Sequence, residues 1–329
     1  MPLSFGVRVS GSRAVPLSFG VRVSGSRGVP LSFGVRVSGS RCVSGSGIKV
    51  ARLILGGMRL AMAQISSGTD PAENLRLVAE ATGRAAADGA ELVVFPEATM
   101  CRFGVKLGPI AQPLDGSWAD GVATIAAEHG VSVVAGMFTP EPDGGRVKNT
   151  LLAVTPGGQR TGYDKIHLYD AFGFAESRTV APGAQPVLIT VAGCRVGLAT
   201  CYDIRFPRLF TALARAGADL IVVPASWGAG PGKLRQWQAL ATARALDATA
   251  YVAAVGQAEP PDPEVAASGA PTGIGHSQIT DPFGSVVAAY GSASEVGVHD
   301  IDTAAVGKAR TALAVLANEQ DLTEPRLAF

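Results

Sequence analysis

The sequence predicts an α/β fold in which helices cover a mixed sheet of strands. Short apolar runs alternate with amphipathic helical stretches throughout residues 58–329. Some neighbouring runs are joined by glycine-containing turns, which is typical of antiparallel hairpins, whereas others are separated by a helix, as parallel strands require. Of the 329 residues, 47% are hydrophobic, which is enough for a large buried core. Because no linker interrupts residues 58–329, we expect a single domain there.

The first part of this region predicts three strands separated by two helices. Asp70 precedes Pro71, and this pair is typical of the N-cap and first position of a helix. Gly130 follows the second helical stretch, and a glycine at that place commonly closes a helix. The expected strands are residues 58–65, 91–98 and 131–138, and the expected helices are residues 70–90 and 117–130.

The rest of the region predicts three hairpins and further strands that are separated by helices. Pro156, Gly157 and Gly158 mark the turn of the first hairpin, and Ala192 and Gly193 mark the turn of the second. The hairpins are expected at residues 149–168, 186–200 and 275–290, the helices at 207–218 and 233–250, the strands at 219–226 and 251–258, and a last strand and helix at the C-terminal end. Residues 258–273 are expected to be the only long insertion without regular structure.

The N-terminal 57 residues consist largely of an exact repeat. The segment PLSFGVRVSGSR occurs at residues 2–13, 16–27 and 30–41. Solenoid repeats diverge at surface positions and need enough length to bury a face, so identical short copies rich in Gly and Ser favour a tandem duplication of the coding DNA. We expect residues 1–57 to be disordered and dispensable, with the enzyme starting at Met58. A transit peptide or a basic arm for anionic partners is the alternative interpretation.

Composition excludes several functional classes. The net charge is +1, and removing the eight basic residues of the acid-free tail leaves −7 for residues 58–329, so we expect no nucleic-acid partner. No apolar run approaches the roughly 18 residues of a membrane helix, so we expect no membrane partner. The four cysteines show no C-x-x-C spacing and the four histidines are scattered, so we expect no metal and no disulfide framework. A reducing, cytoplasmic compartment fits this cysteine usage.

Three reactive or charged residues follow the ends of predicted strands. Glu97 follows LVVFP, Lys165 lies in GYDKIHLYD, and Cys201 follows VGLAT. In open α/β folds, ligands gather at the carboxyl ends of strands. An isolated buried cysteine is normally an inert small hydrophobe, so the prediction of catalysis depends on the three residues occurring together.

The chemistry of these residues is that of a thiol nucleophile with a base and an oxyanion donor. A thiol at neutral pH is mostly protonated and needs an adjacent base, a role that fits Glu97. The same carboxyl group can return the proton to a leaving amine. Lys165 and the backbone N–H of Tyr202 are the expected donors to a tetrahedral oxyanion. No G-x-S-x-G motif offers a serine nucleophile instead.

The motifs FPEATM, YDKIHLYD and CYDIRFP, in this order, resemble those of the nitrilase superfamily, the carbon–nitrogen hydrolases. The similarity extends over residues 58–329 and is greatest to the Nit-type amidases, which include omega-amidases and deaminated-glutathione amidases. This resemblance implies a four-layer α-β-β-α sandwich, a homodimer or higher homo-oligomer, and a catalytic set of Glu97, Lys165 and Cys201. It also implies that Glu176, in FGFAES, orients the lysine or assists the base.

Departures from the family pattern bear on the substrate. Nitrilases usually have Trp-Glu after the cysteine, whereas this chain has Tyr202-Asp203, which favours amides over nitriles. Arg205 could hold a substrate carboxylate or pair with Asp203, and the pairing is slightly favoured. Trp227 could line the pocket or belong to the core.

We therefore expect a cofactor-free amidase that hydrolyses a small linear carboxamide through a Cys201 thioester. The alternatives are an N-carbamoyl or nitrile hydrolase that uses the same site, and a catalytically silent scaffold or binding protein on the same fold.

Overall fold

Two sheets face each other across a shared apolar core in the computed structural model, which describes residues 57–323. In strand β1 (Gly57–Gln64), Leu60 and Met62 contribute to this core, while Ala61 and Ala63 contribute to a second apolar cluster on the other face. This alternation follows from the two-residue repeat of a strand. Because both faces are apolar, both need to be covered by other elements.

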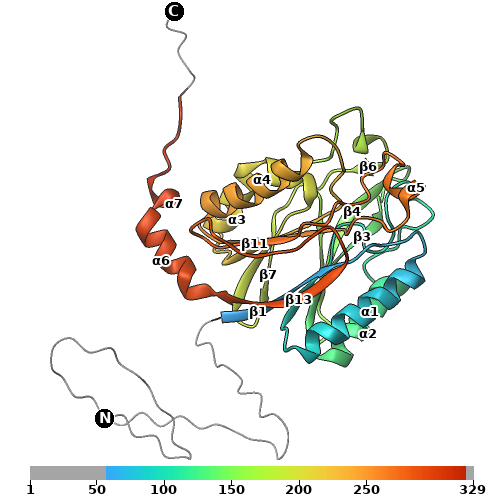
Figure 1. Ribbon diagram of the computed structural model, residues 1–329, viewed down its shortest axis with the longest axis horizontal. Coiled ribbons are helices and arrows are strands. Elements are labelled where there is room, and N and C mark those ends of the chain that lie inside the picture. The colour runs from blue at the N-terminus through green and yellow to red at the C-terminus, as the bar shows by residue number, and fades with distance from the viewer. Residues whose placement is uncertain (1–56, 324–329) are drawn as a thin grey trace, which may run out of the picture. The chain divides into compact units, whose positions relative to one another are not determined.

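Helices cover the outer face of each sheet, so the order of layers is helix, sheet, sheet, helix (Figure 1). Trp118 and Val122 of one helix pair, and Phe210 and Trp237 of the other, pack against the outer faces. This arrangement confirms the α-β-β-α sandwich. The helices are α1 (Pro71–Ala87), α2 (Ser117–His129), α3 (Pro207–Arg215), α4 (Lys233–Ala248), α5 (Pro263–Ala266), α6 (Thr303–Leu313) and α7 (Val315–Asn318), and the 3-10 helices are η1 (Glu176–Arg178) and η2 (Cys201–Arg205).

The seven-stranded sheet is covered by α1 and α2. Its strands are β1 and, further along the chain, β2 (Leu92–Val94), β3 (Ser132–Pro140), β4 (Val147–Val154), β5 (Arg160–Asp164), β6 (Val180–Ala181) and β13 (Glu295–Asp302). The order is β13-β1-β2-β3-β4-β5, with β6 paired to β4. The strands β1, β2 and β3 run parallel, and β4 and β5 form the predicted hairpin.

The six-stranded sheet is covered by α3 and α4. Its strands are β7 (Val187–Val191), β8 (Cys194–Leu198), β9 (Leu220–Ala225), β10 (Tyr251–Gly256), β11 (Gln278–Thr280) and β12 (Val286–Ala289). The order is β12-β11-β10-β9-β8-β7. The strands β8, β9 and β10 run parallel, and the other two predicted hairpins, β7–β8 and β11–β12, are antiparallel.

Local sequence signals account for the helix ends. The Asp70 carboxylate accepts a hydrogen bond from the Ala72 N–H at the start of α1, as its place before Pro71 predicts. Gly130 ends α2 with φ of 66°, a left-handed conformation that costs little without a side chain.

The expectation of one long irregular insertion was wrong in two respects. Residues 258–273 contain the short helix α5, which Asp262 caps just as Asp70 caps α1. Residues 95–116 contain no helix or strand. Pro96 has no N–H with which to continue β2, and Met100 N–H instead donates to the carbonyl of Gly136.

The repetitive tail, residues 1–57, lies outside the described residues except for Gly57, so the predictions of its disorder and dispensability remain predictions. Within residues 57–323, no helix is both long and apolar enough to cross a membrane.

Candidate active site

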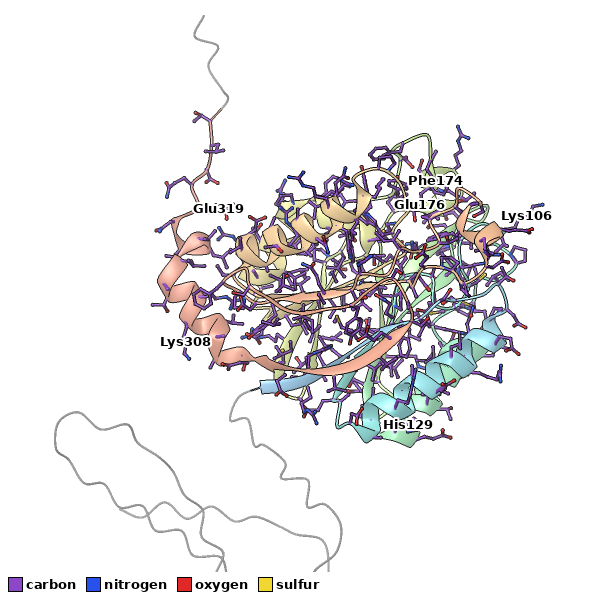
Figure 2. The ribbon with its side chains drawn as sticks, in the orientation of Figure 1. Lys106, His129, Phe174, Glu176, Lys308 and Glu319 are labelled. Atoms are coloured by element: carbon purple, nitrogen blue, oxygen red, sulfur yellow. The ribbon has the colours of Figure 1, made fainter. Side chains whose placement is uncertain are left out.

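Strand ends from both sheets meet at one cavity. Glu97 follows β2 and Lys165 follows β5 in the seven-stranded sheet, whereas Cys201 follows β8 in the six-stranded sheet. All three line the same cavity together with Glu176, which begins η1. Figure 2 shows Glu176 and Phe174 beside one another on the side of the fold that carries β6. The structure therefore brings together the four residues that the sequence singles out.

A buried lysine lies between two buried carboxylates. The Lys165 Nζ is 2.9 Å from Glu97 Oε1 and 2.8 Å from Glu176 Oε2. The three side chains are at most 3% exposed. Charges removed from water at this depth are tolerated only when they are paired and hydrogen-bonded, and each of these has further partners. Glu176, for example, also accepts a hydrogen bond from the Tyr169 N–H at 2.7 Å.

Asn149 completes this arrangement and was not singled out from the sequence as a site residue. Its Nδ2 donates to Glu97 Oε1 at 2.8 Å and to Glu176 Oε1 at 3.1 Å, so one amide group holds both carboxylates. Its backbone carbonyl accepts from the Lys165 N–H at 2.8 Å. The available signal was an amide residue inside the largely buried strand β4, where a polar side chain needs a buried partner.

The second oxygen of Glu97 is held by the opposite sheet. Glu97 Oε2 accepts from the Ser226 N–H at 2.7 Å, directly after β9. A Cβ on Gly136 would lie 2.8 Å from the Cα of Glu97, so only glycine allows β3 to approach this closely. The Gln257 side chain donates to the Glu97 carbonyl at 3.0 Å. Glu97 is thus fixed through its backbone and through both carboxylate oxygens.

Cys201 lies at a sharp bend between β8 and η2. Its φ is 45°, in the left-handed region that is unfavourable for a residue with a side chain. The Cys201 thiol lines the same cavity as the Glu97 carboxylate, and its Sγ is 4.0 Å from the Ser226 carbonyl oxygen. Tyr202, whose N–H was the expected oxyanion donor, follows immediately and lines the cavity.

The Asp203 carboxylate stabilises the bend that carries Cys201. Its carboxylate accepts from the Thr200 N–H at 2.8 Å and from the Tyr163 hydroxyl at 2.7 Å, and it lies 2.7 Å from His167 Nδ1. Asp203 is fully buried. These contacts connect the turn that carries Cys201 to the segment that carries Lys165.

The expected ion pair between Arg205 and Asp203 was wrong, because Asp203 is occupied by the partners just described. The Arg205 Nη2 instead donates to Gln236 Oε1 at 2.6 Å. Its guanidinium lies 5.1 Å from the Trp227 ring centroid and 5.7 Å from that of Tyr202. Arg205 and Trp227 both line the cavity, although Trp227 is only 4% exposed.

The ionisable groups perturb one another strongly. Burial opposes the charge on Lys165, but Glu176 and Glu97 outweigh it and hold the pKa of the ammonium well above its usual value. Burial, followed by the negative charge of Glu97, raises the pKa of the Cys201 thiol well above its usual value. The resting site therefore holds a charged lysine and a protonated thiol.

The other described cysteines do not line this cavity. The Cys101 Sγ is 3.4 Å from the Thr69 carbonyl oxygen, and burial raises the pKa of its thiol. Burial and Asp219 raise the pKa of Cys194 to about 12. Cys194 belongs to the core between the sheets. Within residues 57–323, no cluster of three or more His, Cys, Asp or Glu side chains could hold a metal ion.

Comparison with known proteins now assigns the family. The family model described as Carbon-nitrogen hydrolase matches residues 59–311. The chain belongs to the carbon-nitrogen hydrolase family. In this carbon-nitrogen hydrolase, the matched region includes Glu97, Lys165, Glu176 and Cys201.

Individual relatives agree with this assignment. "Hydrolase Rv0480c" of Mycobacterium tuberculosis is 59% identical over 273 residues, which cover 81% of this chain and 97% of the relative. "Deaminated glutathione amidase" of Escherichia coli O157:H7 is 34% identical and covers 75% of this chain and 92% of the relative. The crystal structure of Saccharomyces cerevisiae Nit3, a nitrilase-superfamily member, superposes with a TM-score of 0.69 at 26% identity, covering 80% of this chain and 96% of Nit3. The predicted resemblance to the Nit-type amidases is confirmed.

Proposed function

We propose that this carbon-nitrogen hydrolase is a cofactor-independent thiol amidase that converts a small linear carboxamide to a carboxylic acid and ammonia. One observation carries the proposal: the buried Glu97 carboxylate, which is paired with the Lys165 ammonium, lines the same small cavity as the Cys201 thiol. This arrangement supports a mechanism in which a nucleophile, Cys201, its base, Glu97, and a cation, Lys165, act on one substrate carbonyl group. The amidase name of the Escherichia coli relative supports the same reaction class.

The first half of the reaction forms a thioester. Glu97 takes the proton of Cys201 as Sγ attacks the amide carbon. The cluster of Glu97, Glu176, Lys165 and the neutral Cys201 thiol contains two carboxylates and one ammonium, and this proton transfer leaves its net charge unchanged. A free thiolate would instead add a second uncompensated charge, which agrees with the direction of the Cys201 pKa. The base therefore acts during the attack rather than before it.

The oxyanion of the tetrahedral intermediate is stabilised by the Lys165 ammonium and the Tyr202 N–H. The protonated Glu97 then gives its proton to the departing nitrogen, and ammonia leaves as the C–N bond breaks. Water attacks the thioester carbon while Glu97 again takes a proton, and the C–S bond breaks to return the Cys201 thiol with that proton. Glu176 and Asn149 hold Lys165 and Glu97 in place throughout.

The substrate class that we propose is an ω-amide of a dicarboxylic acid. Arg205 carries the cation best placed to bind the free carboxylate, since it lines the cavity and has no carboxylate among its hydrogen-bond partners in residues 57–323. Trp227 and Tyr202 flank the guanidinium and would keep it in position.

The first test is ammonia release from a panel of ω-amides, with full-length wild type, Cys201→Ala and Cys101→Ala side by side. Cys101 is the matched control, because it is also buried but lies outside the cavity. We expect Cys201→Ala to abolish release and Cys101→Ala to retain it. Carbon dioxide release from carbamoyl compounds would favour the N-carbamoyl hydrolase instead. Silence toward amides, nitriles and carbamoyl compounds would contradict the enzyme assignment and favour a scaffold.

We further propose that the enzyme is a homodimer, works in a reducing cytoplasmic compartment and does not need residues 1–57. The described cysteines, Cys101, Cys194 and Cys201, are all free thiols, which supports the reducing compartment. Light scattering of the full chain checks the dimer. Removal of residues 1–57 is expected to leave ammonia release unchanged.

A further inference from the structure

A second cavity opens beside the reaction cavity and is much larger. The reaction cavity has a volume of about 20 Å³, whereas the outer cavity has a volume of about 660 Å³. A volume of roughly 10–15 Å³ holds one water molecule, and ligand cavities commonly span about 300–1,000 Å³. The reaction cavity thus has little room beyond the amide-bearing end of a substrate, and a long substrate chain has to lie in the outer cavity.

The outer cavity is walled by small and aromatic residues and carries one positive charge. Among the described residues that line this cavity, Lys233 is the only one with a side chain that is charged at neutral pH. It also lines the reaction cavity, so it stands where the two cavities meet. The remaining lining residues are Tyr169, Phe172, Gly173, Phe174, Gly228, Ala229, Gly230, Pro231, Ala266, Ala267, Gly269, Ala270 and Pro271.

The ammonium of Lys233 has aromatic neighbours and no described anionic partner. Its Nζ lies 3.6 Å from the Phe172 ring centroid and donates a hydrogen bond to the Tyr169 hydroxyl at 3.0 Å. No carboxylate within residues 57–323 forms an ion pair with it. Phe172 is 72% exposed, so the charge is held at the open side of the cavity rather than in the core.

The backbone around Lys233 also favours an anion. Lys233 is the first residue of α4, whose first turn contains no acidic side chain and whose N-cap, Gly232, makes no side-chain cap. The positive end of a helix dipole and its free N–H groups attract negative charge. A negatively charged ligand is therefore favoured by three features together: the cavity, the Lys233 ammonium without an ion-pair partner, and the positive end of α4.

We propose that Lys233 is a specificity-determining residue that binds a carboxylate on the distal part of an extended amide substrate. This inference rests on the proposed amidase function and sharpens its substrate class. In the proposed binding mode, the carboxamide of the substrate reaches Cys201 in the reaction cavity. The apolar chain of the substrate lies along the aromatic and small residues of the outer cavity, and the distal carboxylate binds the Lys233 ammonium. Arg205, within the reaction cavity, is the site for a carboxylate close to the amide.

The kinetic test compares sebacamate, the monoamide of a long dicarboxylic acid, with its methyl ester, which lacks the distal charge. The quantity measured is the ratio of kcat/KM for the two compounds by ammonia release. Lys233→Met is expected to lower this ratio about tenfold, an amount equivalent to about 1.4 kcal/mol, mainly through KM. Lys233→Arg is expected to keep the ratio. Lys308→Met, on α6 and far from Glu176 in Figure 2, is the matched control and is expected to keep it too.

A binding test does not depend on turnover. Calorimetric titration of full-length Cys201→Ala with sebacate is expected to give a Kd that rises about tenfold when Lys233→Met is added, and no such rise for dimethyl sebacate. Equal Kd values with and without Lys233→Met, or an unchanged kinetic ratio, would overturn the role of Lys233. Loss of all amide turnover in wild type would instead overturn the proposed function, so the two failures are distinguishable.

Discussion

The seven-stranded sheet brings the buried ion pairs of the candidate site, whereas the six-stranded sheet brings the Cys201 thiol and a backbone donor. Glu97, Lys165 and Asn149 all come from the first sheet or directly follow its strands, and they are joined by hydrogen bonds of 2.8–2.9 Å. Cys201 and Ser226 follow strands of the second sheet. There the notable feature is a bent backbone, with φ of 45° at Cys201.

This difference between the two sheets shows how a rigid site can still be reactive. Each charge is held by several partners, so it does not need to reorganise when an oxyanion forms. The Cys201 thiol, by contrast, has no strong hydrogen-bond partner among the described residues of its own sheet, since the Ser226 carbonyl oxygen is 4.0 Å from Sγ. We expect the reaction to take place between the two sheets, where Glu97 accepts hydrogen bonds from both.

The largest effect is expected for replacing Glu97, whose carboxylate accepts hydrogen bonds from both sheets. Glu97→Gln removes the base while keeping the size of the side chain, and it should lower kcat by about 10²- to 10⁴-fold, up to about 5.5 kcal/mol of barrier. Single-turnover ammonia release measures it. Glu80→Gln, an exposed carboxylate on α1, is the matched control. An equally active Glu97→Gln variant would mean that the thiol is activated by something other than the first sheet.

The next effect concerns the charge balance of the seven-stranded sheet. Lys165→Met leaves Glu97 and Glu176 buried without their cation, and it should lower the free energy of unfolding by about 3–5 kcal/mol. Urea denaturation followed by circular dichroism measures the loss. Adding Glu176→Gln should restore part of the stability, because one uncompensated charge is removed, yet activity should stay absent. Restored activity would contradict the role of Lys165 as oxyanion donor.

A smaller effect is expected for Asn149→Ala, which removes one amide from two carboxylates. The loss in stability should be about 1–3 kcal/mol, the cost of leaving buried acceptors without a donor. As a positioning residue, Asn149 should change kcat more than KM. Asn149→Asp is the informative companion, because a third carboxylate repels the other two and should be worse than alanine in both measurements.

The smallest effect tests the thiol itself through pH. The pKa of Cys201 is raised in the folded state above its ordinary value of 9.0, so its contribution to stability is present below pH 9 and is lost as pH rises. Between pH 9 and 10, wild type should lose about 1 kcal/mol more than Cys201→Ala, because the unfolded thiol ionises there while the folded thiol keeps its proton. Denaturant titrations at the two pH values measure the difference. Parallel losses in both proteins would indicate a thiolate in the folded state.

Much of the fold was predictable because its signals are local. Asp70 before Pro71, Gly130 after a helix, and the turns at Gly158 and Gly193 each depend on the conformational preference of one or two residues. The strands follow from apolar runs, and their pairing follows from these turns. The irregular course of residues 95–116 was missed, because it depends on contacts with a strand that lies far along the chain.

The candidate site shows the same limit to what the sequence predicts. The sequence by itself determined which reactive side chains follow strand ends, so Glu97, Lys165 and Cys201 were singled out in advance, and the resemblance to the family added Glu176. Only the tertiary structure decided their partners: that Asn149 holds both carboxylates, that Asp203 belongs to Tyr163 and His167 rather than to Arg205, and that Lys233 has no ion-pair partner within residues 57–323. Residue type sets what a group can donate or accept, but distances of about 3 Å between segments far apart in the chain arise only when the two sheets pack face to face.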